Sequence, residues 1–214
     1  MKTSRFSIRR HIGWLMTASL LLALAGCAAE PTQPGSTAGT GVAAAPPAKT
    51  DAPAAARPTI RVKAGMEAPL TDSQGVKWSA DTGFEGGQTI DRPDLKVTGT
   101  PTPELYRSER YSMTSYGFAV PKGNYVVKLH FSEDYEGVTT AEERQFTYAV
   151  KDGPAATGKI VKEVKSFSPW KASGAHSKAY VDTVHVNVTA GKISITFVPQ
   201  VENPQINALE IIPE

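Results

Sequence analysis

Hydrophobic and polar positions alternate in short runs over most of the chain from residue 59 onward. The run Thr59-Ile60-Arg61-Val62 is apolar at every second position, and a similar run at 125–131 follows the turn Lys122-Gly123-Asn124. This period of two predicts strands with one buried face. The same reading predicts strands at residues 59–62, 116–120, 125–131, 145–150, 159–167, 180–188, 193–198 and 206–212.

The spacing of these runs indicates a fold class. Turn signals such as Pro121, Asp152-Gly153 and Ala190-Gly191-Lys192 separate the strands, and no window between them has a convincing helical period. Short strands without intervening helices predict an all-β, antiparallel β-sandwich, of which the jelly roll is the form we favour. Residues 59–214 are long enough for one domain with its own core.

The first 26 residues have the layout of an export signal. Four basic residues and no acidic ones occur there, and an apolar run of about a dozen residues ends at Leu24-Ala25-Gly26-Cys27. That run is shorter than the roughly 20 residues of a membrane-spanning helix. Leu-Ala-Gly-Cys resembles the lipobox of bacterial lipoproteins, which implies cleavage before Cys27 and acylation of that residue with chains such as palmitate. Ala28 in the next position implies, by the same resemblance, sorting to the outer membrane of the cell envelope.

The alternative is an ordinary secretory signal whose cysteine follows Ala-Gly by chance. Cys27 is the only cysteine, so neither a disulfide framework nor a thiolate metal site can form within one chain.

Residues 27–58 continue as a segment rich in Ala, Pro and Thr with almost no large apolar side chain. Such a composition predicts a disordered tether.

Cleavage would also change the charge of the protein. The complete chain has a formal charge of +2, and loss of four basic residues makes it −2. The mature chain then has no basic excess that would attract a phosphate backbone, so we expect no nucleic-acid partner.

Three stretches resemble the malectin family of carbohydrate-binding domains. They are Leu-Tyr-Arg-Ser-Glu-Arg-Tyr at 105–111, Tyr-Val-Val-Lys-Leu-His-Phe-Ser-Glu-Asp-Tyr at 125–135, and Glu-Asn-Pro-Gln-Ile-Asn-Ala-Leu at 202–209. They occur in the family's order and lie between residues 105 and 209 of the predicted domain at 59–214. The resemblance implies a galactose-binding-like, malectin-like jelly roll whose loops present tyrosines and a carboxylate to a glucose-type oligosaccharide.

The resemblance assigns three carbohydrate-binding residues, Tyr111, Tyr135 and Glu202, and places them at one end of the fold. Aromatic rings stack on the apolar face of a pyranose, and a carboxylate accepts two of its hydroxyls. Each residue also has a structural reading: the tyrosines as packing residues and Glu202 as a solvated carboxylate.

Two departures from the family remove ring surface. Glu136 stands where the family has a second aromatic, and Gln88-Thr89-Ile90 stands where an aromatic follows a turn like Gly86-Gly87. An acidic rim expected from Glu133, Asp134, Glu136 and Glu202 would favour a different or cationic partner. Glu109 and Arg110, adjacent on one strand, are expected to form structural ion pairs.

No motif indicates catalysis. The sequence has no Gly-x-Ser-x-Gly elbow, its histidines do not occur at metal-ligand spacing, and no feature selects two carboxylates for glycoside hydrolysis. We therefore expect a non-catalytic carbohydrate-binding lipoprotein without a cofactor or metal. The alternative is an envelope scaffold that uses the sandwich surface to bind a protein or peptidoglycan partner.

Overall fold

The computed structural model describes residues 57–214. The predicted signal peptide, Cys27 and nearly all of the predicted tether lie outside the described residues. Among residues 57–214, no helix is both long enough and apolar enough to cross a membrane.

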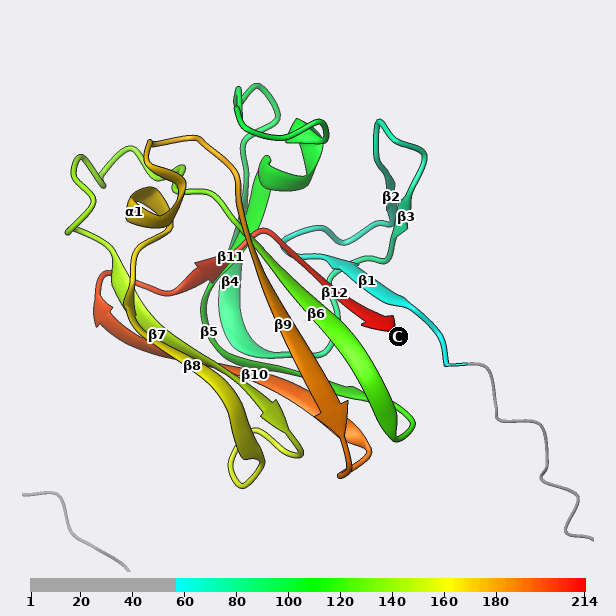
Figure 1. Cartoon of the computed structure of the whole chain (residues 1–214). Helices are drawn as coiled ribbons and strands as arrows, with labels where there is room; N and C mark the ends of the chain where they lie inside the picture. Colours follow the sequence, from blue (N-terminus) through cyan, green and yellow to red (C-terminus); the bar gives the residue numbers. More distant parts are fainter. Residues whose placement is uncertain (1–56) are drawn as a thin grey trace, which may run out of the picture. The chain divides into compact units, whose positions relative to one another are not determined.

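Antiparallel strands make up most of the described chain (Figure 1). The elements are β1 (Ile60–Lys63), β2 (Leu70–Thr71), β3 (Lys77–Trp78), β4 (Phe84–Asp91), a 3₁₀ helix (Pro103–Tyr106), β5 (Ser108–Ala119), β6 (Gly123–Phe131), β7 (Gln145–Asp152), β8 (Lys159–Phe167), α1 (Pro169–Ser173), β9 (Tyr180–Val188), β10 (Lys192–Val201), β11 (Gln205–Ile206) and β12 (Ala208–Pro213). The predicted all-β fold is confirmed.

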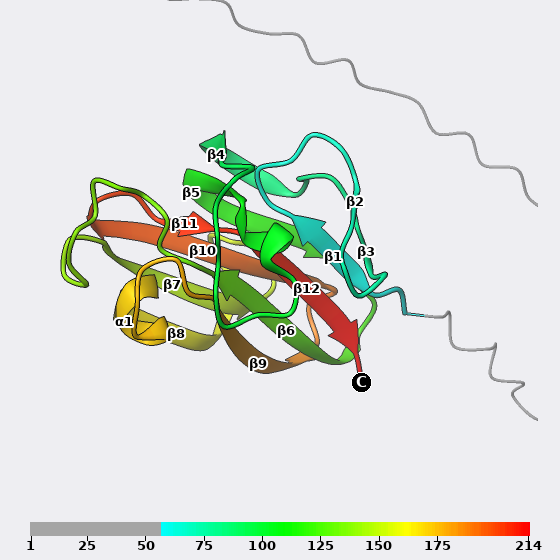
Figure 2. The same ribbon diagram turned by 90° about the horizontal axis from the view of Figure 1, so that it is seen from above.

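The larger strands form two layers, which Figure 2 shows from above. One sheet has four strands in the order β1-β12-β6-β9. The other has the order β11-β5-β10-β7-β8, with β4 also paired to β5. Tyr111 pairs with Gln88 of β4 and with Gln205 of β11, so β4 follows one edge of β5 while β10 and β11 share the opposite edge.

The inner faces of the two sheets form the core. Along β9 the buried positions 182, 184, 186 and 188 alternate with exposed ones, as expected for a strand with one face on the core. Phe131 of the four-stranded sheet meets Phe146, Tyr148 and Phe167 of the other sheet, with ring centroids 4.8–6.1 Å apart. This apolar packing holds the two layers together.

The structure corrects two expectations about local structure. The structure contains helix α1 and the 3₁₀ helix, whereas the sequence predicts no helix. Each of them is too short to produce a helical period in the sequence. In α1, Ser168 caps the first turn by accepting a hydrogen bond from Lys171 N at 3.3 Å, and Gly174 ends the helix at φ 82°. Strand β4 was also missed, because all of its residues are exposed and no alternation marks it.

Candidate functional site

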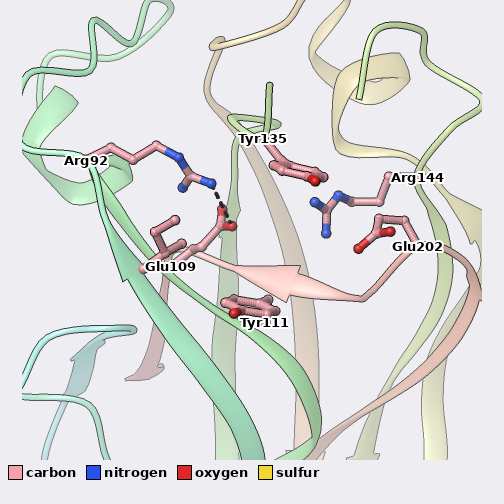
Figure 3. A pocket seen from close by; sticks show the side chains of 7 residues that line it. Arg92, Glu109, Tyr111, Tyr135, Arg144 and Glu202 are labelled. Atoms are coloured by element: carbon pink, nitrogen blue, oxygen red, sulfur yellow. Dashed lines mark hydrogen bonds and ion pairs between the residues drawn. The ribbon is translucent and has the colours of Figure 1, made fainter. Parts of the chain in front are cut away.

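A pocket lies at the end of the sandwich where β4, β6 and β10 finish and β5 and β7 begin (Figure 3). Its volume is about 210 Å³, below the roughly 300–1,000 Å³ of pockets that hold drug-sized ligands. Seven residues line it, namely Ile90, Arg92, Glu109, Tyr111, Tyr135, Arg144 and Glu202. The pocket is therefore suited to one small ring or the end of a longer molecule.

The three residues predicted from the family motifs meet in this pocket. Tyr111 is on β5, Tyr135 follows β6, and Glu202 lies between β10 and β11. Tyr111 is half-buried, whereas Tyr135 is 45% exposed and Glu202 is also exposed. The structure thus brings two rings and a carboxylate to one partly open surface.

Pairing between β4 and β5 fixes the position of Tyr111. Its hydroxyl donates to Oε1 of Gln88 at 2.7 Å, and these residues face each other across the two strands. Gln88 occupies the segment where the family has an aromatic. Ile90 of the same segment contributes an apolar side chain to the pocket, in place of a ring.

Glu202 is held by the local backbone. Its φ of 58° lies in the left-handed region, where the chain turns out of β10 toward β11. The side-chain amide of Asn203 donates to Oε1 of Glu202 at 2.8 Å. This contact orients the carboxylate and leaves its second oxygen available for a ligand.

Arg144 connects the two loops that carry Tyr135 and Glu202. Its Nε lies 2.7 Å from Oε2 of Glu133, close enough for an ion pair although the N–H is not aligned for a hydrogen bond, and Nη1 donates to the carbonyl of Asn203. The guanidinium lies 6.0 Å from the ring centre of Tyr135. Arg144 and Glu133 are both nearly fully buried, so the pair is shielded from water.

Glu109 and Arg92 form a second charged pair at the pocket. Nη2 of Arg92 donates to Oε1 of Glu109 at 3.5 Å, and only 3% of the Glu109 side chain is exposed. Burial raises the pKa of the Glu109 carboxyl, and the nearby guanidiniums of Arg92 and Arg144 oppose that rise. The expected structural pairs are present, since Arg110 also contacts Asp81 at 2.7 Å, but Glu109 in addition lines the pocket.

The expected acidic rim is wrong. Glu133 and Asp134 are each 1% exposed and lie beneath the surface, because Glu133 turns inward to Arg144. Glu136 is exposed but does not line the pocket. The lining instead contains two arginines and two glutamates. Arg92 pairs with Glu109 and Arg144 pairs with Glu133, so Glu202 is the lining carboxylate that has no ion pair among residues 57–214.

Asp134 gives the stability of the domain a distinctive pH dependence. Ser132 Oγ donates to its Oδ1 at 3.0 Å, while Oδ2 is buried without a partner among residues 57–214. Burial raises the pKa of Asp134 from 3.8 to about 6. Between pH 3.8 and pH 6, Asp134 keeps its proton in the folded state but has lost it in the unfolded state. Proton binding at Asp134 therefore stabilises the fold; this contribution is complete below pH 3.8 and is lost as the pH rises through 6.

We therefore expect Asp134→Asn to flatten the pH dependence of unfolding. Between pH 4 and pH 7 the wild type should lose on the order of 2–3 kcal/mol more stability than the variant, because two pKa units correspond to about that free energy. Urea unfolding of both proteins at several pH values measures the difference. Parallel curves for wild type and variant would contradict the role of Asp134.

The comparisons with known proteins agree with this architecture. The family model for the malectin domain matches residues 59–209, more than half of the chain. The chain belongs to the malectin family.

Mouse malectin is 30% identical over 173 residues, covering 71% of this chain and 55% of its own length. The kinesin-like protein KIN-14E of rice is 33% identical over 97 residues, covering 45% of this chain and 9% of its own. The chain thus spans about half of malectin and a small part of KIN-14E.

Solved structures share the fold of this malectin domain at lower identity. The ANX1 ectodomain from Arabidopsis thaliana has a TM-score of 0.59 and 15% identity, covering 72% of this chain and 47% of its own. The Bacteroides uniformis β-glucuronidase has a TM-score of 0.60 and 19% identity, covering 73% of this chain but only 18% of the enzyme. These similarities establish the sandwich alone.

Proposed function

We propose that this protein is a non-catalytic, lipid-anchored cell-envelope protein whose malectin domain binds a glucose-type or related oligosaccharide. The observation that carries the proposal is that Tyr111, Tyr135 and Glu202, far apart in sequence, line a single pocket. Two rings offer apolar surface to the face of a sugar, and the carboxylate accepts hydrogen bonds from its hydroxyls. The small volume suits one sugar unit, with the remaining units outside.

Tyr111→Ala tests the site directly. The variant should bind about fivefold more weakly, because it loses a stacking contact of about 1 kcal/mol. Tyr111→Phe keeps the ring and should keep most of the affinity, although it loses the hydrogen bond to Gln88. Calorimetry of the full chain with glucose, maltose, galactose, glucuronic acid and glucosamine measures the effect, and chromatography of the same mixtures tests for hydrolysis.

The outcomes separate the alternatives. Binding of no saccharide by the wild type would favour the envelope scaffold over the carbohydrate-binding protein. Release of glucose from maltose would show that the protein hydrolyses the sugar instead of only binding it. Equal affinities of wild type and Tyr111→Ala would show that the saccharide binds outside this pocket.

The lipid anchor is tested separately at Cys27. Acyl chains gain about 0.8 kcal/mol for each buried methylene, so several of them hold a protein stably at a membrane. Cys27→Ser should abolish incorporation of a palmitate analogue and release the protein from the membrane fraction or leave it as uncleaved precursor. Labelling of the serine variant would exclude Cys27 as the acylated residue.

A further inference from the structure

The floor of the pocket contains hydrogen-bonding atoms that the protein itself does not use. Oε2 of Glu109 and Nη1 of Arg92 are both buried, and neither has a hydrogen-bond partner among residues 57–214. Figure 3 shows the two side chains next to each other, with the carboxylate of Glu109 between Arg92 and the rest of the site. An unsatisfied buried polar atom costs about 1–3 kcal/mol. A ligand that supplies the missing partners therefore gains affinity there.

The charges around these atoms indicate what kind of ligand fits. Arg92 neutralises Glu109, and Arg144 neutralises Glu133 behind the pocket wall. An anionic group placed at the floor would accept a hydrogen bond from Arg92 but would be repelled by the carboxylate of Glu109. A cationic group would be repelled by the guanidinium of Arg92. A neutral hydroxyl avoids both conflicts because it can donate and accept.

We propose that Glu109 and Arg92 are specificity-determining residues that bind adjacent free hydroxyls on the edge of a neutral sugar. One hydroxyl donates to Oε2 of Glu109, and the oxygen of its neighbour accepts from Nη1 of Arg92. Tyr111 and Tyr135 then contact the ring, and Glu202 binds at the open side. This inference rests on the proposed carbohydrate binding and extends it to the hydroxyl pattern that the site selects.

The test compares Glu109→Gln with wild type in calorimetry of the full chain with maltose. Glutamine has nearly the same shape, but its amide nitrogen cannot accept a hydrogen bond, so we expect affinity to fall about 10- to 100-fold. Glu163→Gln is the matched control, because Glu163 is an exposed residue of β8 and lies outside the pocket lining; it should bind as wild type does. Thermal unfolding of each variant shows whether the fold is intact.

A second measurement changes the sugar. Monodeoxy derivatives of maltose each lack one hydroxyl, and we expect two derivatives that lack adjacent hydroxyls to bind wild type at least tenfold more weakly. The derivative that loses the hydroxyl bound by Glu109 should bind wild type and Glu109→Gln with similar affinity, because both lack the same hydrogen bond.

Each result decides between the two proposals. If maltose binds wild type and a folded Glu109→Gln equally, or if every deoxy derivative binds as maltose does, the role of the floor is overturned while the carbohydrate-binding function stands. Exclusive binding of glucuronic acid or glucosamine would overturn the preference for neutral sugars. Binding of no saccharide would overturn the proposed function itself, and the floor assignment with it.

Discussion

Replacing Lys63 by methionine should lower the free energy of unfolding by about 1–3 kcal/mol. The Lys63 side chain is completely buried, and its Nζ donates to the carbonyls of Ala64 at 2.7 Å, Ser108 at 2.8 Å and Asn207 at 2.9 Å. These carbonyls belong to segments next to β1, at the start of β5 and between β11 and β12. Methionine fills a similar volume but supplies no donor, so each of the three buried carbonyls would lose one of its two donors. The remaining donors are Ser108 Oγ, Asn207 Nδ2 and Ala64 N.

Lys165→Met is the matched control for this prediction. The Lys165 side chain is 75% exposed on β8 and lies 3.3 Å from Glu163 on the same strand. A surface pair of this kind contributes about 0–1 kcal/mol. Urea denaturation of both variants measures the difference, and a loss below about 1 kcal/mol for Lys63→Met would show that the hydrogen bonds of its Nζ contribute little to stability.

Arg144→Met should destabilise the domain more, by about 3–5 kcal/mol. The substitution leaves the carboxylate of Glu133 buried without its cation and removes the donor from the Asn203 carbonyl. Because Arg144 connects the loops that carry Tyr135 and Glu202, we also expect weaker saccharide binding at temperatures where the variant is still folded.

A second substitution identifies the cause of this loss. In Arg144→Met/Glu133→Gln no carboxylate remains at position 133, so the double variant should recover a large part of the stability. Arg61→Met is the control, because it also removes an arginine from an ion pair, here with Glu210, but 31% of the Arg61 side chain is exposed. It should lower the free energy of unfolding by about 1 kcal/mol or less. Failure of the double variant to recover would assign the loss to the Asn203 carbonyl and to packing.

The sandwich could be predicted because its core strands alternate. Strands β6, β9 and β10 each have one face on the core, and their apolar positions follow the period of two that marks a half-buried strand. Strand β4 could not be found this way because both of its faces are exposed, and Gly86-Gly87 is typical of a turn. The short helices were missed because one or two turns leave no period to detect.

The site could be predicted only as far as the family motifs reach. Tyr111, Tyr135 and Glu202 were identified from motif positions, and the structure places them together. Arg92 and Arg144 are outside those motifs, and sequence alone does not show that Arg144, just before β7, is buried. Glu109 was inside a motif but was assigned a structural role, which its pair with Arg92 does fulfil. The inward turn of Glu133 depends on Arg144, eleven residues further along, and no local pattern reveals it.

The position of β12 has a consequence for how the domain forms. This strand lies between β1 and β6, and the antiparallel pairing of β1 is with β12, so Ile60 meets Ile211 across most of the folded chain. Contacts between residues so distant in sequence form slowly, because a long loop must close before they are made. During synthesis, β1 must wait for residues 208–213 to be made before it can join the sheet. Glu202 and β11 are made just before them, so the pocket cannot be complete until this part of the chain has been made.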